Sequence, residues 1–139
     1  MFQRILLPTD FSSSADAALR LARSHFPGAA RLLLHVLNPR QLAEQIGPSV
    51  TADDRREEIE REARERLAAL AGSAEETAVR VGPPAETILL HADEWDADLI
   101  VMGTHGRTGL ALFLNGSVAE QVVRHGRLPV LIEHERQLD

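Results

Sequence analysis

The stretch that decides the fold is residues 98–106, Asp98-Leu99-Ile100-Val101-Met102-Gly103-Thr104-His105-Gly106. Its four consecutive apolar residues, 99–102, predict a strand that is covered on both faces, as strands of parallel sheets are. Gly103 opens a glycine-rich loop that extends to Gly116, and a helix is predicted from Ser117 to about His125. The stretch therefore predicts one buried strand, its loop and the helix that follows.

Further strands and helices alternate before and after this stretch. Apolar or alternating runs predict other strands at residues 5–7, 32–37, 77–81 and 129–132, and helical spacing predicts helices at residues 12–26, 51–70 and 84–92. Residues 41–50 show no clear period and contain Gly47-Pro48, so we predict a loop there. Strands that alternate with helices predict a three-layer α/β sandwich, in which a parallel sheet lies between two layers of helices.

The expected strand order follows from the polarity of the strands. Only residues 77–81 alternate clearly between polar and apolar side chains, so we expect this strand at an edge. Right-handed crossovers then accommodate the order 3-2-1-4-5 in chain numbering. The winding reverses between strands 5–7 and 99–102, and open α/β sheets bind ligands beside such a reversal. We expect one domain over residues 1–139, because no linker or internal repeat is evident.

The composition excludes several classes of site. The 139 residues include 15 arginines, no lysine and no cysteine, and the net charge is −6. A P-loop, a protein kinase and a Schiff-base enzyme each need a lysine, and many zinc and iron–sulfur sites need cysteine. The negative charge and the few aromatic residues argue against nucleic-acid binding. No apolar run is long enough to span a membrane and no signal peptide is evident, so we expect a cytoplasmic protein.

The glycines after the strand at 99–102 are spaced Gly103-x2-Gly106-x9-Gly116-Ser117. Glycines let backbone N–H groups approach an anion, and a helix N-terminus adds a partial positive charge. The pattern indicates either a phosphate-binding cradle that needs no lysine or a tight connection that merely uses glycine. The spacing alone leaves both interpretations open.

This spacing resembles the nucleotide-binding signature of the universal stress protein family. The likeness extends to residues 5–12 (Ile-Leu-Leu-Pro-Thr-Asp-Phe-Ser), 98–106, 117–122 (Ser-Val-Ala-Glu-Gln-Val) and 129–131 (Pro-Val-Leu), and it is weakest at residues 41–50. The resemblance implies a Rossmann-like fold of the adenine nucleotide alpha hydrolase type, with the order 3-2-1-4-5. It also implies the ATP-binding subgroup, because the glycine signature is kept.

The resemblance further implies a set of nucleotide contacts. It assigns Asp10 to the base and ribose end of the pocket, Val36 to adenine, and the three glycines with Ser117 to the phosphates. The expected cofactor-binding residues are Pro8, Thr9, Asp10, Val36, Met102, Gly103, His105, Gly106, Arg107, Gly116, Ser117 and Val118. Many ATP-binding relatives carry a basic residue near position 111, where this chain has Ala111. Mg²⁺ or Mn²⁺ bound through the phosphates is therefore expected to supply positive charge.

Some of these side chains have a second interpretation. Asp10 follows a strand, so it is either a ligand residue or a cap of the next turn. His105 either contacts phosphate or is an exposed loop residue. Residues 12–14 are three serines, which we interpret as helix caps rather than nucleophiles, and His35 is interpreted as a hydrogen-bonded core residue. The spacing of His and acidic residues predicts no metal site held by the protein itself.

The strand at 129–132 is expected to be an apolar edge. Residues 129–132 carry no charge before Glu133, and an uncovered edge offers unpaired backbone groups to another chain. We therefore expect two copies to pair here in a homodimer, as the resemblance also implies. The alternative is that residues 134–139 fold back over this edge.

The resemblance implies a regulatory protein of the stress response that binds an adenine nucleotide, ATP, and is read by a protein partner that the sequence does not identify. We expect no catalytic residue and at most weak ATP hydrolysis, because no lysine or carboxylate–histidine pair is evident to activate water. The alternatives are a slow ATPase or autophosphorylating protein, and a dimeric interaction module that acts without nucleotide.

Overall fold

The computed structural model describes residues 1–47, 52–104 and 116–134, and within them the chain forms a five-stranded sheet. The strands are β1 (Arg4–Pro8), β2 (Ala30–Leu37), β3 (Glu76–Val81), β4 (Leu99–Gly103) and β5 (Val130–Glu133). Their order is β3-β2-β1-β4-β5, and every neighbouring pair is parallel. The predicted order 3-2-1-4-5 is confirmed.

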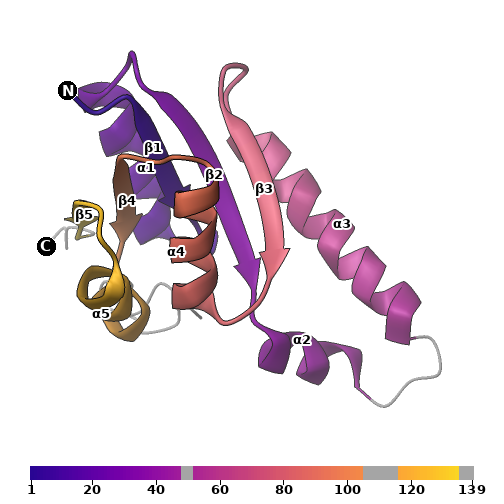
Figure 1. Cartoon of the computed structure of the whole chain (residues 1–139). Coiled ribbons are helices and arrows are strands. Elements are labelled where there is room, and N and C mark those ends of the chain that lie inside the picture. Colours follow the sequence, from indigo (N-terminus) through magenta and orange to yellow (C-terminus); the bar gives the residue numbers. More distant parts are fainter. Residues whose placement is uncertain (48–51, 105–115, 135–139) are drawn as a thin grey trace, which may run out of the picture.

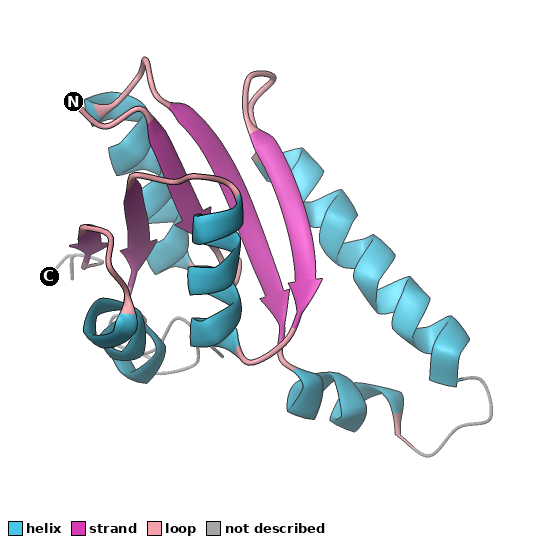
Figure 2. Ribbon diagram, in the orientation of Figure 1, coloured by secondary structure: helices cyan, strands magenta, loops and turns pink. Residues whose placement is uncertain are grey.

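Helices cover both faces of this sheet (Figures 1 and 2). One face is covered by α4 (Pro84–Glu94) and α5 (Gly116–His125), and the other by α1 (Ser13–His25) and α3 (Ala52–Leu70). The chain is therefore an α/β sandwich of three layers, as predicted. Among the residues described here, no helix combines the length and the apolar character needed to cross a membrane.

Alternate residues of the strands enter two separate cores. Leu6 and Ile100 pack against the face with α4 and α5. Their neighbours Ile5 and Val101 pack against the face with α1 and α3. Because side chains alternate along a strand, a strand buried on both faces needs apolar residues at consecutive positions. This requirement explains the continuous apolar runs of β1 and β4.

Residues 39–46 form a helix, although the sequence predicts a loop over residues 41–50. This helix, α2 (Pro39–Ile46), begins after Asn38, whose side chain accepts a hydrogen bond from the Arg40 N–H at 3.0 Å. An asparagine N-cap and a proline in the first turn favour a helix start. The loop prediction is wrong because Asn38-Pro39 ends β2 and starts α2 at once. In Figure 1, α2 lies beyond the carboxyl ends of β2 and β3.

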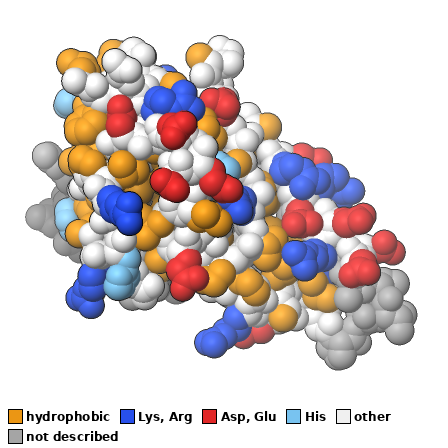
Figure 3. Space-filling view, in the orientation of Figure 1, with side chains coloured by type: hydrophobic (Ala, Val, Ile, Leu, Met, Phe, Trp, Pro, Cys, Tyr) orange, Lys and Arg blue, Asp and Glu red, His pale blue; other side chains and the backbone are white. Residues whose placement is uncertain are grey.

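The helix predicted at residues 51–70 is α3 (Ala52–Leu70), whose sequence is rich in charged residues. Ile59, Ala63 and Leu67 form a buried apolar stripe along one side of α3. Positive and negative side chains are mixed over the exposed side of α3 (Figure 3). Pairs such as Arg55 with Glu58, at 3.2 Å, are exposed and contribute little to stability. The apolar stripe therefore holds α3 against the sheet.

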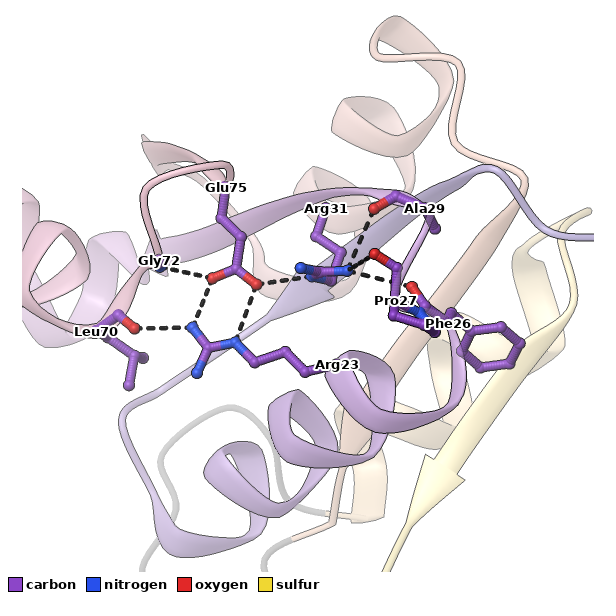
Figure 4. Close-up of polar contacts among 8 residues, drawn as sticks. All are labelled: Arg23, Phe26, Pro27, Ala29, Arg31, Leu70, Gly72 and Glu75. Atoms are coloured by element: carbon purple, nitrogen blue, oxygen red, sulfur yellow. Dashed lines mark hydrogen bonds and ion pairs between the residues drawn. The ribbon is translucent and has the colours of Figure 1, made fainter.

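Glu75 joins three segments at the amino ends of β2 and β3 (Figure 4). Its side chain is only 2% exposed, and it accepts hydrogen bonds from Arg23 at 2.5 and 3.0 Å and from Arg31 at 2.7 Å. The Gly72 N–H donates to the same carboxylate at 2.8 Å. Hydrogen bonding to Arg23 outweighs burial and lowers the pKa of Glu75 to about 2. We call Glu75, Arg23 and Arg31 the carboxylate clamp.

Candidate functional site

The winding of the sheet reverses between β1 and β4, and the predicted site residues Pro8, Thr9, Asp10 and Gly103 lie at the carboxyl ends of these strands. β1 ends at Pro8 and pairs with β2 on one side and β4 on the other. The Thr9 N–H donates to the Leu34 carbonyl at 2.8 Å, so the chain stays attached to β2 as it leaves β1. The turn that follows is therefore held at the position where open α/β sheets bind ligands.

Asp10 lies in this turn with one carboxylate oxygen engaged and the other not. Oδ1 accepts a hydrogen bond from the Ser12 N–H at 3.0 Å. Oδ2 is buried and has no hydrogen-bond partner among the described residues. A buried oxygen without a partner has lost its hydration without compensation, so it calls for an explanation such as an absent ligand. Asp10 thus caps the turn, as one interpretation expected, and also presents a second oxygen that the turn does not use.

A small cavity of about 70 Å³ lies beside Asp10. Its lining also includes His35 and Val36 of β2 and, from the end of β2 and from α2, Leu37, Asn38, Gln41, Leu42 and Gln45. The α2 residues are not among the site residues predicted from the sequence, although the helix-start signal at Asn38-Pro39 indicates a helix beside the site. Pockets for small molecules usually measure about 300–1,000 Å³, so the cavity outlines only one end of such a site.

His35 belongs to this cavity rather than to the interior of the core. Its Nδ1 donates to the Thr9 carbonyl at 2.8 Å, because a carbonyl oxygen can only accept. Burial lowers the pKa of His35, while the Thr9 hydrogen bond and Asp10 act in the opposite direction and Arg66 acts with burial. The prediction of a hydrogen-bonded histidine is confirmed, whereas its assignment to the core is wrong, because His35 is only partly buried and is part of the cavity lining.

Gly103 brings the end of β4 against the first turn of α1. A Cβ at this position would lie 2.3 Å from the Ser14 carbonyl oxygen and 2.9 Å from the Ala15 nitrogen. Both are backbone atoms, so only a glycine fits without movement of the helix. This close approach supports a packing role for Gly103, whichever contacts it makes with phosphate. Met102, before it, is fully buried in the core with α4 and α5.

The remaining predicted phosphate contacts fall at the start of α5 or outside the described residues. Gly116 and Ser117 are the first residues of α5, and Val118 is buried in the first turn. The first turn of a helix has N–H groups without partners inside the helix and carries a partial positive charge. His105, Gly106 and Arg107, together with Ala111, lie outside the described residues.

Of the three serines at residues 12–14, Ser12 is the N-cap of α1, and the other two lie within the helix. Ser12 Oγ accepts a hydrogen bond from the Ala15 N–H at 3.2 Å and lies 3.2 Å from Ser14 Oγ. The capping interpretation is thus confirmed for Ser12. Within residues 1–47, 52–104 and 116–134, no group of three or more His, Asp or Glu side chains is placed to hold a metal ion.

The model of the universal stress protein family matches residues 1–134. The chain belongs to this family. It is 29% identical over 153 residues to a universal stress protein of Methanocaldococcus jannaschii, with 95% of this chain and 94% of that protein covered. It is 35% identical over 137 residues to a universal stress protein of Thermus aquaticus, with 95% and 98% covered.

Solved structures of universal stress proteins agree with this fold. The structure of the same Methanocaldococcus jannaschii protein superposes with a TM-score of 0.81 at 29% identity and covers 99% of each chain. A universal stress protein in complex with cAMP has a TM-score of 0.61 at 28% identity, with 97% of this chain and 99% of that chain covered. A relative of this universal stress protein therefore binds an adenine nucleotide.

Proposed function

We propose that this universal stress protein binds an adenine nucleotide, ATP, at the carboxyl ends of β1, β2 and β4, and that it regulates a protein partner through this binding. The observation that carries the proposal is the buried Oδ2 of Asp10, which has no partner among the described residues, on a side chain that lines a cavity together with Val36. A carboxylate oxygen can accept a hydrogen bond from a ribose hydroxyl or a base amine. The cAMP complex of a relative supports the same class of ligand.

In this proposal, the base and ribose of the nucleotide bind beside the turn after β1, and its phosphates bind beside the glycine residues and the start of α5. Asp10 and Val36, with Pro8 and Thr9 as the frame of the turn, hold the base and ribose. Gly103, Gly106, Gly116 and Ser117 hold the phosphates, with the Val118 main chain as a further donor. Met102, His105 and Arg107 complete the proposed contacts. Mg²⁺ or Mn²⁺ would accompany the phosphates, because position 111 carries Ala111 rather than a basic residue.

Native mass spectrometry of the purified protein tests the class of ligand, and calorimetric titration with ATP tests the glycine signature. We expect Gly116→Val to abolish ATP binding, because its side chain would occupy space that the phosphates need. Gly28→Val is the matched control: Gly28 lies in the turn after α1, where an added Cβ meets no atom within 4 Å. Equal ATP affinity in Gly116→Val and wild type would show that the glycines only form a connection.

We also propose that two copies pair through β5. Within the described residues, β5 pairs only with β4, so its other edge is open. Beside it lies a groove of about 560 Å³ with Val123 and Ile132 in its lining, and the side chains of Val123 and Leu131 are exposed. Residues 135–139, which could instead cover this edge, lie outside the described part of the chain.

Light scattering tests the pairing. We expect wild type to have the mass of a dimer and Leu131→Arg to have the mass of a monomer, because a charge on the open edge would be buried at the interface. Leu90→Arg is the matched control, because Leu90 is an exposed leucine on α4, away from β5. A monomeric wild type, or a dimeric Leu131→Arg variant, would contradict the proposed interface.

A further inference from the structure

Phe11 has a backbone conformation that its residue type rarely adopts. Its φ is 67°, in the left-handed region, where the Cβ of an L-residue is crowded and where glycine is favoured. Such conformations persist where the surroundings hold them, and they concentrate at ligand-binding turns. A phenylalanine at this position therefore indicates that its side chain makes contacts that a glycine could not make.

Hydrogen bonds fix the turn on both sides of Phe11. The Phe11 N–H donates to Thr9 Oγ1 at 2.9 Å, and the next N–H, of Ser12, donates to Asp10 Oδ1 at 3.0 Å. Phe11 thus donates to Thr9 and directly precedes the residue whose N–H holds the Asp10 carboxylate. Any change of φ at Phe11 would move the Ser12 N–H away from Asp10 Oδ1.

The phenyl ring connects this turn to β2 and α3. Its centroid lies 4.6 Å from that of the His35 ring, with a tilt of 38° between the planes. The Arg66 guanidinium carbon lies 4.0 Å from the same phenyl centroid, which is the geometry of a cation–π contact. His35 is itself held by the Thr9 carbonyl at 2.8 Å. The ring therefore contacts one residue that lines the cavity and one residue on a surface helix.

We propose that Phe11 is a positioning residue of the nucleotide site: its ring, held by His35 and Arg66, fixes the left-handed turn that directs the second oxygen of Asp10 to the ligand. Arg66 makes α3 part of this arrangement, so occupancy of the cavity and the position of α3 are coupled through Phe11. This inference rests on the proposed nucleotide binding. It assigns a role to a side chain that has no predicted contact with the nucleotide itself.

Calorimetric titration with ATP of three single variants tests the coupling. Phe11→Gly permits the left-handed backbone and removes the side chain, so the protein should fold and ATP affinity should fall about tenfold through the loss of positioning. Arg66→Gln should weaken binding several-fold in the same way. Arg64→Gln is the matched control, with the same charge change on the same helix and an exposed side chain, and it should leave the affinity unchanged. Thermal unfolding verifies that each variant is folded.

Double-mutant cycles separate positioning from a general effect on the fold. If Phe11 acts through Asp10, then Phe11→Gly causes no further loss of ATP affinity in an Asp10→Asn background. If Arg66 acts through the ring, then Arg66→Gln causes no further loss in a Phe11→Gly background. If Phe11→Gly does not fold, Arg66→Gln still tests the inference, because Arg66 is exposed and its substitution should not prevent folding.

The outcomes distinguish the inference from the function on which it rests. A Phe11→Gly substitution that lowers ATP affinity by the same factor in the wild-type and Asp10→Asn backgrounds, or an Arg66→Gln variant that binds ATP like wild type, would overturn the role of Phe11 and leave nucleotide binding intact. Wild-type protein that binds no adenine nucleotide would overturn the proposed function and the inference together.

Discussion

Two carboxylates at opposite ends of the sheet are held in very different ways. At the amino ends of β2 and β3, both oxygens of Glu75 are hydrogen-bonded, by Arg23, Arg31 and the Gly72 N–H. At the carboxyl end of β1, Asp10 has one oxygen bonded to the Ser12 N–H and one buried oxygen without a partner among the described residues. A fully paired carboxylate stabilises the fold, whereas a carboxylate left half-paired by its own chain indicates a place for a ligand.

The largest expected effect on the free energy of unfolding concerns Gly103. It tests how tightly the carboxyl end of the sheet, where Asp10 lies, is packed. Gly103→Ala places a Cβ 2.3 Å from the Ser14 carbonyl oxygen, so either β4 or α1 must move. We expect the free energy of unfolding to fall by about 3 kcal/mol, as for an overpacked core. Chemical denaturation measures the change. A Gly103→Ala variant as stable as wild type would show that the carboxyl end of the sheet is loosely packed. The unpaired oxygen of Asp10 would then no longer indicate a ligand site.

The next effect concerns the carboxylate clamp. Glu75→Gln removes the charge that pairs with Arg23 and Arg31, and we expect the free energy of unfolding to fall by about 2 kcal/mol at pH 7. ATP affinity should not change, because the clamp lies at the opposite end of the sheet. Urea denaturation and calorimetric titration measure the two quantities. Weaker ATP binding by Glu75→Gln would contradict the proposal that the amino end of the sheet stabilises the fold and only the carboxyl end binds the ligand.

The clamp also predicts a dependence on pH. The pKa of Glu75 is about 2 in the folded protein and 4.5 for an unperturbed carboxyl, so its contribution to stability is fully present above pH 4.5 and is lost as the pH falls toward 2. The difference in free energy of unfolding between wild type and Glu75→Gln should therefore shrink over this interval. A difference that stays constant from pH 5 to pH 2.5 would show that Glu75 does not act through its charge.

The smallest expected effect on stability belongs to Asp10. Asp10→Asn keeps the shape of the side chain and the acceptor for the Ser12 N–H, and it removes a charge that no described residue pairs. We expect the free energy of unfolding to change by less than about 1 kcal/mol. Urea denaturation at pH 7 provides the measurement. A large loss of stability would mean that Asp10 is structural, like Glu75.

The fold was largely predictable because its strands are buried on both faces. The apolar runs at residues 5–7 and 99–102 have one structural explanation, a parallel sheet covered by helices, and the single strand with clear alternation gave the edge and hence the order. α2 was not predictable by periodicity, because it has only two turns and buries only Leu42. The N-cap Asn38 with Pro39 was the only sequence signal for α2. It was read as the end of β2, because the helix begins directly after that strand.

The site was predictable in position but not in detail. The reversal of winding and the glycine spacing indicated the carboxyl ends of β1 and β4, where Asp10, Thr9 and Gly103 lie. The left-handed φ of Phe11 could not be predicted, because a phenylalanine gives no sign of that conformation. The carboxylate clamp could not be predicted either, because Glu75 lies 44 residues from Arg31 and 52 residues from Arg23 in the sequence.

The most direct test compares Asp10→Asn with Glu75→Gln in one pair of measurements, ATP affinity by calorimetry and free energy of unfolding by denaturation. We predict that Asp10→Asn loses at least about tenfold in ATP affinity with its stability nearly unchanged, while Glu75→Gln loses stability with its affinity unchanged. ATP binding by Asp10→Asn that equals wild type, or the absence of binding by wild type, would contradict the assignment of the unpaired oxygen of Asp10 to a nucleotide.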